Sequence, residues 1–146
     1  MTHLADYSRA EPTQQVCRPS QSSWGYKGFH EYWLNETNAW IYPHLHKAAE
    51  RMIEISQLEP EDELGWRALN QAARELLLAQ SSDWAFIMRT GTMVPYAVRR
   101  TRSHLMRFNK LYEDVKIDKI DSGWLEKVEL MDNIFPNINY RVYRPL

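Results

Sequence analysis

An aromatic segment at residues 22–40 holds the side chains best suited to binding chemistry. It contains three Trp, two Tyr and one Phe, and it is interrupted by Gly25 and Gly28. This composition is typical neither of a regular amphipathic helix nor of an alternating strand, so we expect an irregular loop. Glycine permits a positive φ and lets another group approach the backbone closely. Tyr and Trp offer a large apolar face with a polar tip, which matches a pyranose ring with its axial C–H bonds on one face.

The same rings also have a structural use, because aromatic side chains contribute much of the buried surface of protein cores. The segment could therefore seal a helical core instead of meeting a sugar. The local pattern leaves both interpretations open.

Signatures of other chemistry are scarce. The sequence has no phosphate-binding glycine loop, no dinucleotide fingerprint and no serine in a nucleophile-elbow pattern. His44 and His46 are two residues apart, which on a helix directs them away from each other and disfavours a shared metal ion. Glycoside chemistry needs two carboxylates that flank a bond, and the spacing of Glu31, Glu36 and Asp83 selects no pair. We therefore predict no catalytic residue, no metal site and no cofactor.

The totals place the chain in a broad class. With 146 residues it has the length of one domain. A formal net charge of −1 gives no overall field that would attract nucleic acid or an anionic membrane. Cys17 is the only cysteine, which excludes an internal disulfide and a multi-cysteine metal site. Because no stretch resembles a signal peptide or a membrane span, we expect a cytoplasmic protein with neither a nucleic-acid nor a membrane partner.

Hydrophobic periodicity predicts an all-α fold, a bundle of about four to five helices preceded by an extended, aromatic-rich N-terminal segment. Asn38 and Thr92 are expected N-caps, and Asp121 or Ser122 is expected to cap a short last helix. The expected helices run from 41 to before Pro60, from 61 to about 80, from 83 to near 91, from 94 through 112, and from about 122 through 131. The final residues, from 134 on, are expected to pack back over the helices as an irregular tail.

Several charged residues on these helices have two possible interpretations. Asp83 follows two serines, so it could cap the third helix, or its carboxylate could accept hydrogen bonds from sugar hydroxyls. Arg74 and Glu75 are expected to be solvated or paired, and the alternative is that they line a site. The arginine cluster of the long helix is expected to form a solvated face; its members are Arg99, Arg100, Arg102 and Arg107.

Residues 1–21 differ in composition from the rest. Pro12 and Pro19 lie among polar residues with few apolar anchors, which favours an extended linker. A chain that begins in a linker can be the end of something longer.

Two long motifs resemble one known family. SSWGYKGFHEYWLN at 22–35, continued by NAWIYPHLH at 38–46, is the first, and NQAARELLLAQSSDW at 70–84 is the second. Both resemble the C-terminal helical domain of 1,4-α-glucan branching enzymes of glycoside hydrolase family 57, particularly the cyanobacterial type. The resemblance covers nearly the whole chain from about Leu4. It implies a role in glycogen or α-glucan biosynthesis.

The resemblance also implies how this chain would take part. In the family a β/α barrel precedes the helical domain and carries the glutamate nucleophile and the aspartate acid/base. The helical domain packs on that barrel and closes the glucan cleft. Residues 1–21 would then be a linker or the end of a missing upstream barrel, and residues 22–146 the C-terminal helical domain. Without either barrel carboxylate, the chain is expected to be inactive alone.

Site residues follow from the same resemblance. The family places two cleft-lining tryptophans nine residues apart, a separation that Trp24 and Trp33 match, so both are expected to stack on an α-1,4-glucan of the amylose or glycogen type. Asp83 is expected to be a further substrate-binding residue. The alternative is a free-standing, non-catalytic helical module that binds α-glucan or another protein.

Overall fold

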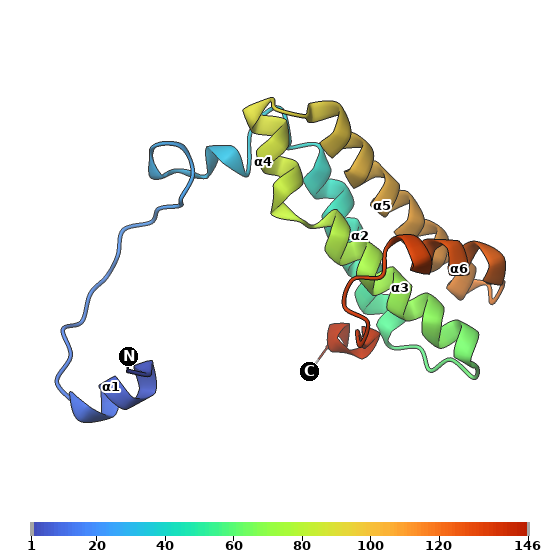
Figure 1. The fold of residues 1–146 in the computed structure, drawn as a ribbon, viewed down its shortest axis with the longest axis horizontal. Coiled ribbons are helices and arrows are strands. Elements are labelled where there is room, and N and C mark those ends of the chain that lie inside the picture. The colour runs from blue at the N-terminus through green and yellow to red at the C-terminus, as the bar shows by residue number, and fades with distance from the viewer. Residues whose placement is uncertain (1, 146) are drawn as a thin grey trace.

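The computed structural model describes residues 2–145, which form helices and loops with no strand among them. Figure 1 shows the bundle of five helices. These are α2 (Ile41–Ser56), α3 (Glu63–Ala79), α4 (Ser82–Thr90), α5 (Val94–Lys116) and α6 (Ser122–Met131). A short helix, α1 (Leu4–Ala10), precedes them, and three 3₁₀ turns complete the chain: η1 (Tyr26–Gly28), η2 (His30–Tyr32) and η3 (Tyr140–Tyr143). The predicted all-α bundle of four to five helices is confirmed.

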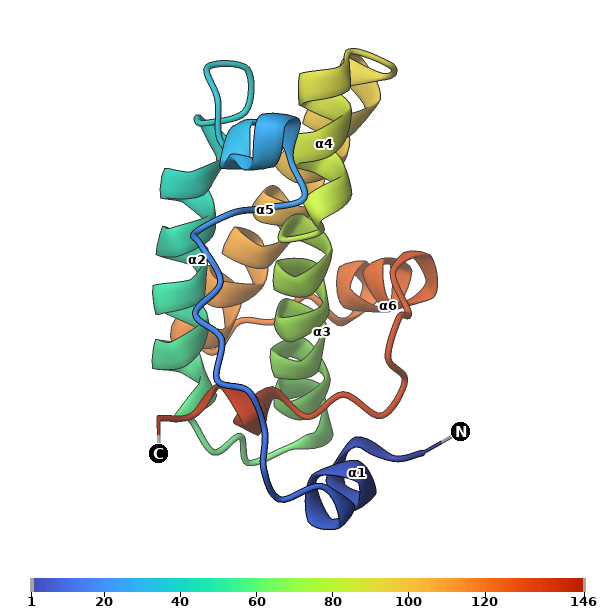
Figure 2. The ribbon, with the colours of Figure 1, turned by 90° about the vertical axis from the view of Figure 1, so that its left-hand side faces the viewer.

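The long helix α5 is the centre of the bundle, because α2, α3 and α4 all pack along it (Figure 2). Small residues on α3 permit this close approach. Ala68, Ala72 and Ala73 are fully buried there, and Phe108 and Leu111 of α5 are fully buried as well. The apolar positions spaced by three and four residues thus form one continuous core.

Three helix ends show ordinary capping chemistry, and two predicted N-caps are absent. The Asp62 carboxylate accepts from the Gly65 N–H at 2.8 Å, and Asp121 caps α6 in the same way through the Trp124 N–H. Gly91 ends α4 with φ +78°. The predicted caps at Asn38 and Thr92 are wrong. Trp40 and Met93 occupy those N-cap positions without a side-chain cap. Asn38 is instead fully buried, and its side chain forms hydrogen bonds to other backbone groups.

The C-terminal tail packs back over α2 and α3, as predicted. Its anchor is Tyr140, which is fully buried. The Tyr140 hydroxyl donates to the Leu58 carbonyl at 3.0 Å, and its N–H donates to the Asn70 side chain at 2.9 Å. Arg74, which was expected to be solvated or paired, donates to the carbonyls of Ile134 and Pro136 and so links the tail to α3.

The N-terminal arm begins with one short helix, which was not predicted within the extended linker. Residues 4–10 form α1. An ion pair between Asp6 and Arg9 spans one turn of this helix. No residue of α1 is buried, and residues 11–20 then run toward the bundle as an extended segment without secondary structure (Figure 1). Among the described residues, no helix combines the length and apolar character that a membrane span requires.

Candidate functional site

Four aromatic rings gather at the end of the bundle where α4 lies, and we call them the aromatic cluster. Trp24, Tyr32 and Trp33 come from the loop, and Phe86 comes from α4. The Trp24 ring centroid lies 5.6 Å from that of Tyr32, 6.2 Å from Trp33 and 5.9 Å from Phe86. Phe86 also stacks on Tyr32 at 5.4 Å and lies 6.1 Å from Trp33. These separations are within the range of favourable aromatic pairs.

The residues of the cluster are exposed or partly exposed to solvent. Trp24 is 75% exposed, and the other three residues of the cluster are half-buried. None of the four belongs to the buried core. Trp24 and Trp33 therefore do not seal the helical core, whose buried aromatic side chains include Trp84, Phe108 and Tyr140. Of the aromatic segment, Trp40 does pack against that core.

The two glycines of the loop have the uses expected of them. Gly28 adopts φ +79°, and Lys27 beside it adopts φ +54°. The Ser23 N–H donates to the Gly28 carbonyl at 2.7 Å, which closes a tight turn around Trp24. Gly25 is buried, and a Cβ there would lie 2.5 Å from the Phe29 carbonyl oxygen. Close approach at Gly25 and left-handed backbone at Gly28 therefore shape the loop that carries the first tryptophan.

The second tryptophan is held from α2. The Tyr42 hydroxyl donates a hydrogen bond to the Trp33 carbonyl. Burial raises the pKa of Tyr42, so this hydroxyl keeps its proton and remains a donor at neutral pH. The backbone of Trp33 is thus fixed while part of its ring stays open to solvent.

Asp83 lies on α4, three residues before Phe86, so the two side chains share one side of the helix. Its carboxylate is exposed and accepts from the Ser81 hydroxyl at 3.0 Å. The interpretation of Asp83 as an N-cap is wrong, because Ser81 holds that position and Asp83 lies in the first turn. A carboxylate in the first turn is favoured by the helix dipole without capping geometry.

Sequence reasoning missed a buried polar network that links α3, α5 and the end of α6. Glu75 Oε2 lies 2.7 Å from His104 Nδ1, and Gln71 donates to Glu75 Oε1 at 2.9 Å. Asp132 Oδ2 lies 3.8 Å from the same histidine nitrogen. Burial raises the pKa of Glu75, although its hydrogen bond to His104 opposes the shift.

This network has the ligand types of a metal site, since the candidate ligand atoms of Glu75, His104 and Asp132 lie within 4.8 Å of one another. However, Arg107 donates to Asp132, and Arg100 lies 3.8 Å from it. Both arginines contact Asp132, so their positive charges at this carboxylate disfavour an added divalent cation. The group is a structural ion-pair network. The same contacts correct the prediction of a wholly solvated arginine face.

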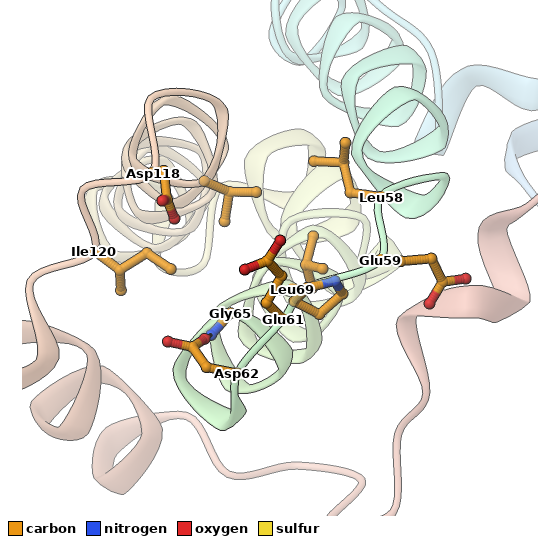
Figure 3. A pocket seen from close by; sticks show the side chains of 10 residues that line it. Leu58, Glu59, Glu61, Asp62, Gly65, Leu69, Asp118 and Ile120 are labelled. Atoms are coloured by element: carbon orange, nitrogen blue, oxygen red, sulfur yellow. Dashed lines mark hydrogen bonds between the residues drawn. The ribbon is translucent and has the colours of Figure 1, made fainter.

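One cavity lies elsewhere, at the N-terminal end of α3 (Figure 3). Its volume is about 320 Å³, and Leu58, Leu69 and Ile120 form part of its apolar lining. Of its acidic residues, Asp62 caps α3 and Glu59 pairs with two arginines of the tail. It is separated from the aromatic cluster by the 17 residues of α3, about 25 Å of helix. The cavity and the cluster are therefore independent features.

Comparison with known proteins agrees with the motifs. Residues 44–143 match the family described as "1,4-alpha-glucan branching enzyme, C-terminal". The chain is 40% identical over 120 residues to the 1,4-α-glucan branching enzyme TK1436 of Thermococcus kodakarensis. The aligned region covers 79% of this chain and 18% of the relative.

Two solved structures extend the comparison. The α-amylase AmyC from Thermotoga maritima matches with a TM-score of 0.73 at 44% identity, over 95% of this chain and 26% of that one. The GH57-type branching enzyme from Pyrococcus horikoshii matches with a TM-score of 0.81 at 34% identity, over 95% of this chain and 28% of that one.

The chain therefore spans less than a third of the length of each of these relatives. The family match itself covers about two thirds of the chain, including all or part of each of the five bundle helices. This chain belongs to the family of C-terminal domains of GH57-type 1,4-α-glucan branching enzymes.

Proposed function

We propose that the aromatic cluster binds α-1,4-glucan as part of a branching enzyme whose catalytic barrel lies upstream of this chain. The observation that carries the proposal is the 75% exposure of Trp24 on a cluster that also holds Trp33. A large indole exposed to this extent is costly for a protein to display, and exposed apolar groups gathered in one place mark binding surfaces. The match to the family of branching-enzyme C-terminal domains supports glucan as the ligand.

The proposed reaction divides the work between two parts. The upstream barrel would supply a nucleophilic carboxylate that cleaves an α-1,4 linkage and forms a covalent glycosyl intermediate, and a second carboxyl group that acts as acid and then base. Transfer to the 6-hydroxyl of another glucan would then release the barrel carboxylate with retention. Trp24 and Trp33 would hold the glucan in place and exclude water, which favours the sugar acceptor over hydrolysis.

Asp83 would contribute a polar contact beside these rings. Its exposed carboxylate has one acceptor oxygen engaged by Ser81, and a carboxylate has further lone pairs for sugar hydroxyls. Phe86, on the same side of α4, would support the ring faces on which the sugar stacks.

We further propose that this protein acts in glycogen-type α-glucan biosynthesis in the cytoplasm. Its single cysteine, Cys17, suits a reducing compartment. The relatives are described both as branching enzymes and as an α-amylase, so transfer rather than hydrolysis is the part of the proposal that an activity measurement must decide.

The test is a calorimetric titration of this chain with maltoheptaose, alone and mixed with the upstream part of TK1436 lacking its own C-terminal region. We expect binding that is strong only in the mixture, because the barrel would form the other wall of the cleft. Firm binding by the chain alone would instead favour the free-standing glucan-binding module. Absence of binding in both experiments would contradict glucan recognition and favour a protein interface.

A further inference from the structure

The side chain of Asn38 joins the two backbone segments that present the aromatic cluster. Asn38 is fully buried. Its amide nitrogen donates to the Tyr32 carbonyl at 3.1 Å and to the Ala85 carbonyl at 3.1 Å. Its amide oxygen accepts from the Asn35 N–H at 2.9 Å. One side chain thus connects the loop to α4 across 47 residues of sequence.

The two carbonyls that accept from Asn38 belong to a cluster residue or to the neighbour of one. Tyr32 is itself a member and precedes Trp33, and Ala85 precedes Phe86. Fixing these two carbonyls fixes where the loop rings stand relative to the ring of α4. Trp24 then packs against this preformed set at 5.6 to 6.2 Å between ring centroids.

Only an amide meets these requirements at this position. The site needs two donors and one acceptor on one short, planar group, which is the hydrogen-bonding capacity of asparagine. Aspartate has the same shape, but its ionised carboxylate has no donor and would face two carbonyl oxygens. An apolar residue would leave buried polar groups without a partner, which costs stability.

We propose that Asn38 is a positioning residue for glucan binding, which holds the aromatic cluster in its binding arrangement without touching the sugar. The inference rests on the glucan-binding role proposed above. A preformed site avoids the cost of ordering its side chains when the ligand arrives. Asn38→Asp is expected to weaken maltoheptaose binding about tenfold, since immobilising two or three side chains at the moment of binding has a cost of this order.

The experiment is ¹⁹F NMR of the chain labelled with 5-fluorotryptophan, combined with maltoheptaose titration under the condition in which the wild type binds. The six tryptophans are assigned by single Trp→Phe variants. In Asn38→Asp we expect the Trp24 and Trp33 signals to shift or broaden. The signals of Trp66 and Trp124, which contact other elements of the bundle, should stay in place.

Gln71→Glu is the matched control. Gln71 is also fully buried, and its amide nitrogen also donates to two acceptors, Glu75 and the Asp132 carbonyl. This control should lower stability while leaving the Trp24 and Trp33 signals and sugar affinity unchanged. If Asn38→Asp does not fold, Asn38→Ser replaces it, because a hydroxyl keeps one donor.

Two results would overturn the inference. Unchanged Trp24 and Trp33 signals in a folded Asn38 variant would remove the positioning role, and equal shifts of all assigned signals would show a merely structural one. The ¹⁹F result does not depend on the ligand. If the wild type fails to bind maltoheptaose while the Trp24 and Trp33 signals still respond selectively to Asn38→Asp, the glucan proposal fails and the connection through Asn38 stands.

Discussion

Replacing Trp24 by alanine should separate sugar binding from folding, because this ring is so little buried. A tryptophan side chain can bury up to about 250 Å². With 75% of its surface exposed, Trp24 has only about 60 Å² removed from water, which at about 25 cal/mol per Å² contributes at most about 1.5 kcal/mol to stability. The loss is expected to be smaller, since the loop can relax around the missing ring.

The effect on binding should be larger. A pyranose stacked on the open face of the indole would bury about 100 Å² of apolar ring surface, worth about 2.5 kcal/mol on the same scale. This corresponds to a loss of affinity of about 60-fold. Calorimetric titration with maltoheptaose, in the mixture with the upstream part of TK1436, gives the affinity, and thermal unfolding of the chain followed by circular dichroism gives the stability.

Trp66→Ala is the control for ring removal. Trp66 is half-buried on α3, and its ring packs edge-on against Tyr140 at 4.8 Å with Arg141 at 4.6 Å on a ring face. This variant should lose about 3 kcal/mol of stability and keep its affinity for the sugar. The reasoning is refuted if Trp24→Ala binds as well as the wild type, or if it unfolds as easily as Trp66→Ala.

Three further changes test neighbouring parts of the structure. Phe86→Ala should weaken maltoheptaose binding about tenfold by removing the ring that contacts Trp24 and Trp33, and unchanged calorimetric affinity would argue against a cluster acting as a unit. Asp83→Asn should reduce affinity several-fold, since a charged acceptor is lost, while the melting temperature falls only slightly, because an exposed first-turn carboxylate gains little from the helix dipole; a variant that melts much earlier but binds normally would mark Asp83 as structural. Burial raises the pKa of Glu75, so the folded protein favours the protonated carboxyl group. The free energy of unfolding that this proton contributes is fully present below the ordinary pKa of about 4.3 and is lost as pH rises through the raised pKa. In urea unfolding, the stability of the wild type minus that of Glu75→Gln should therefore fall as pH rises above about 4.3, and a constant difference would show that Glu75 titrates normally.

The helices were predictable because local patterns specify them. Apolar residues spaced by three and four gave the spans of α2 to α6 to within a few residues at most ends. The two glycines of the loop were also read correctly, since left-handed backbone and close approach are properties of glycine itself. The short helix α1 was missed, because it has no buried face that a hydrophobic pattern could report.

The missed contacts join residues far apart in the sequence. Glu75 meets His104 across 29 positions, and Asn38 meets Ala85 across 47. Helical periodicity places Glu75 on a face of α3 without naming what lies opposite, so its burial could not be foreseen. Asn38 has the residue type of an N-cap, and only the packing of α4 against the loop shows that its amide is used elsewhere.

Phe86 illustrates how far the candidate site could be anticipated. The motif comparison singled out Trp24 and Trp33, which the fold brings within 6.2 Å of each other. Phe86 lies within the helix predicted from 83 to near 91, and no role was predicted for its ring. Its place in the aromatic cluster depends on the angle at which α4 meets the loop, which no local pattern encodes.

The most direct measurement of glucan binding by the aromatic cluster is the set of intermolecular NOEs between maltoheptaose and the ring protons of the chain, recorded with the upstream part of TK1436 present. Glucan stacking predicts NOEs from the axial C–H protons of the sugar to the indole protons of Trp24 and Trp33, and none to those of Trp66. NOEs confined to other surfaces, with the Trp24 and Trp33 protons silent while the sugar is bound, would contradict it.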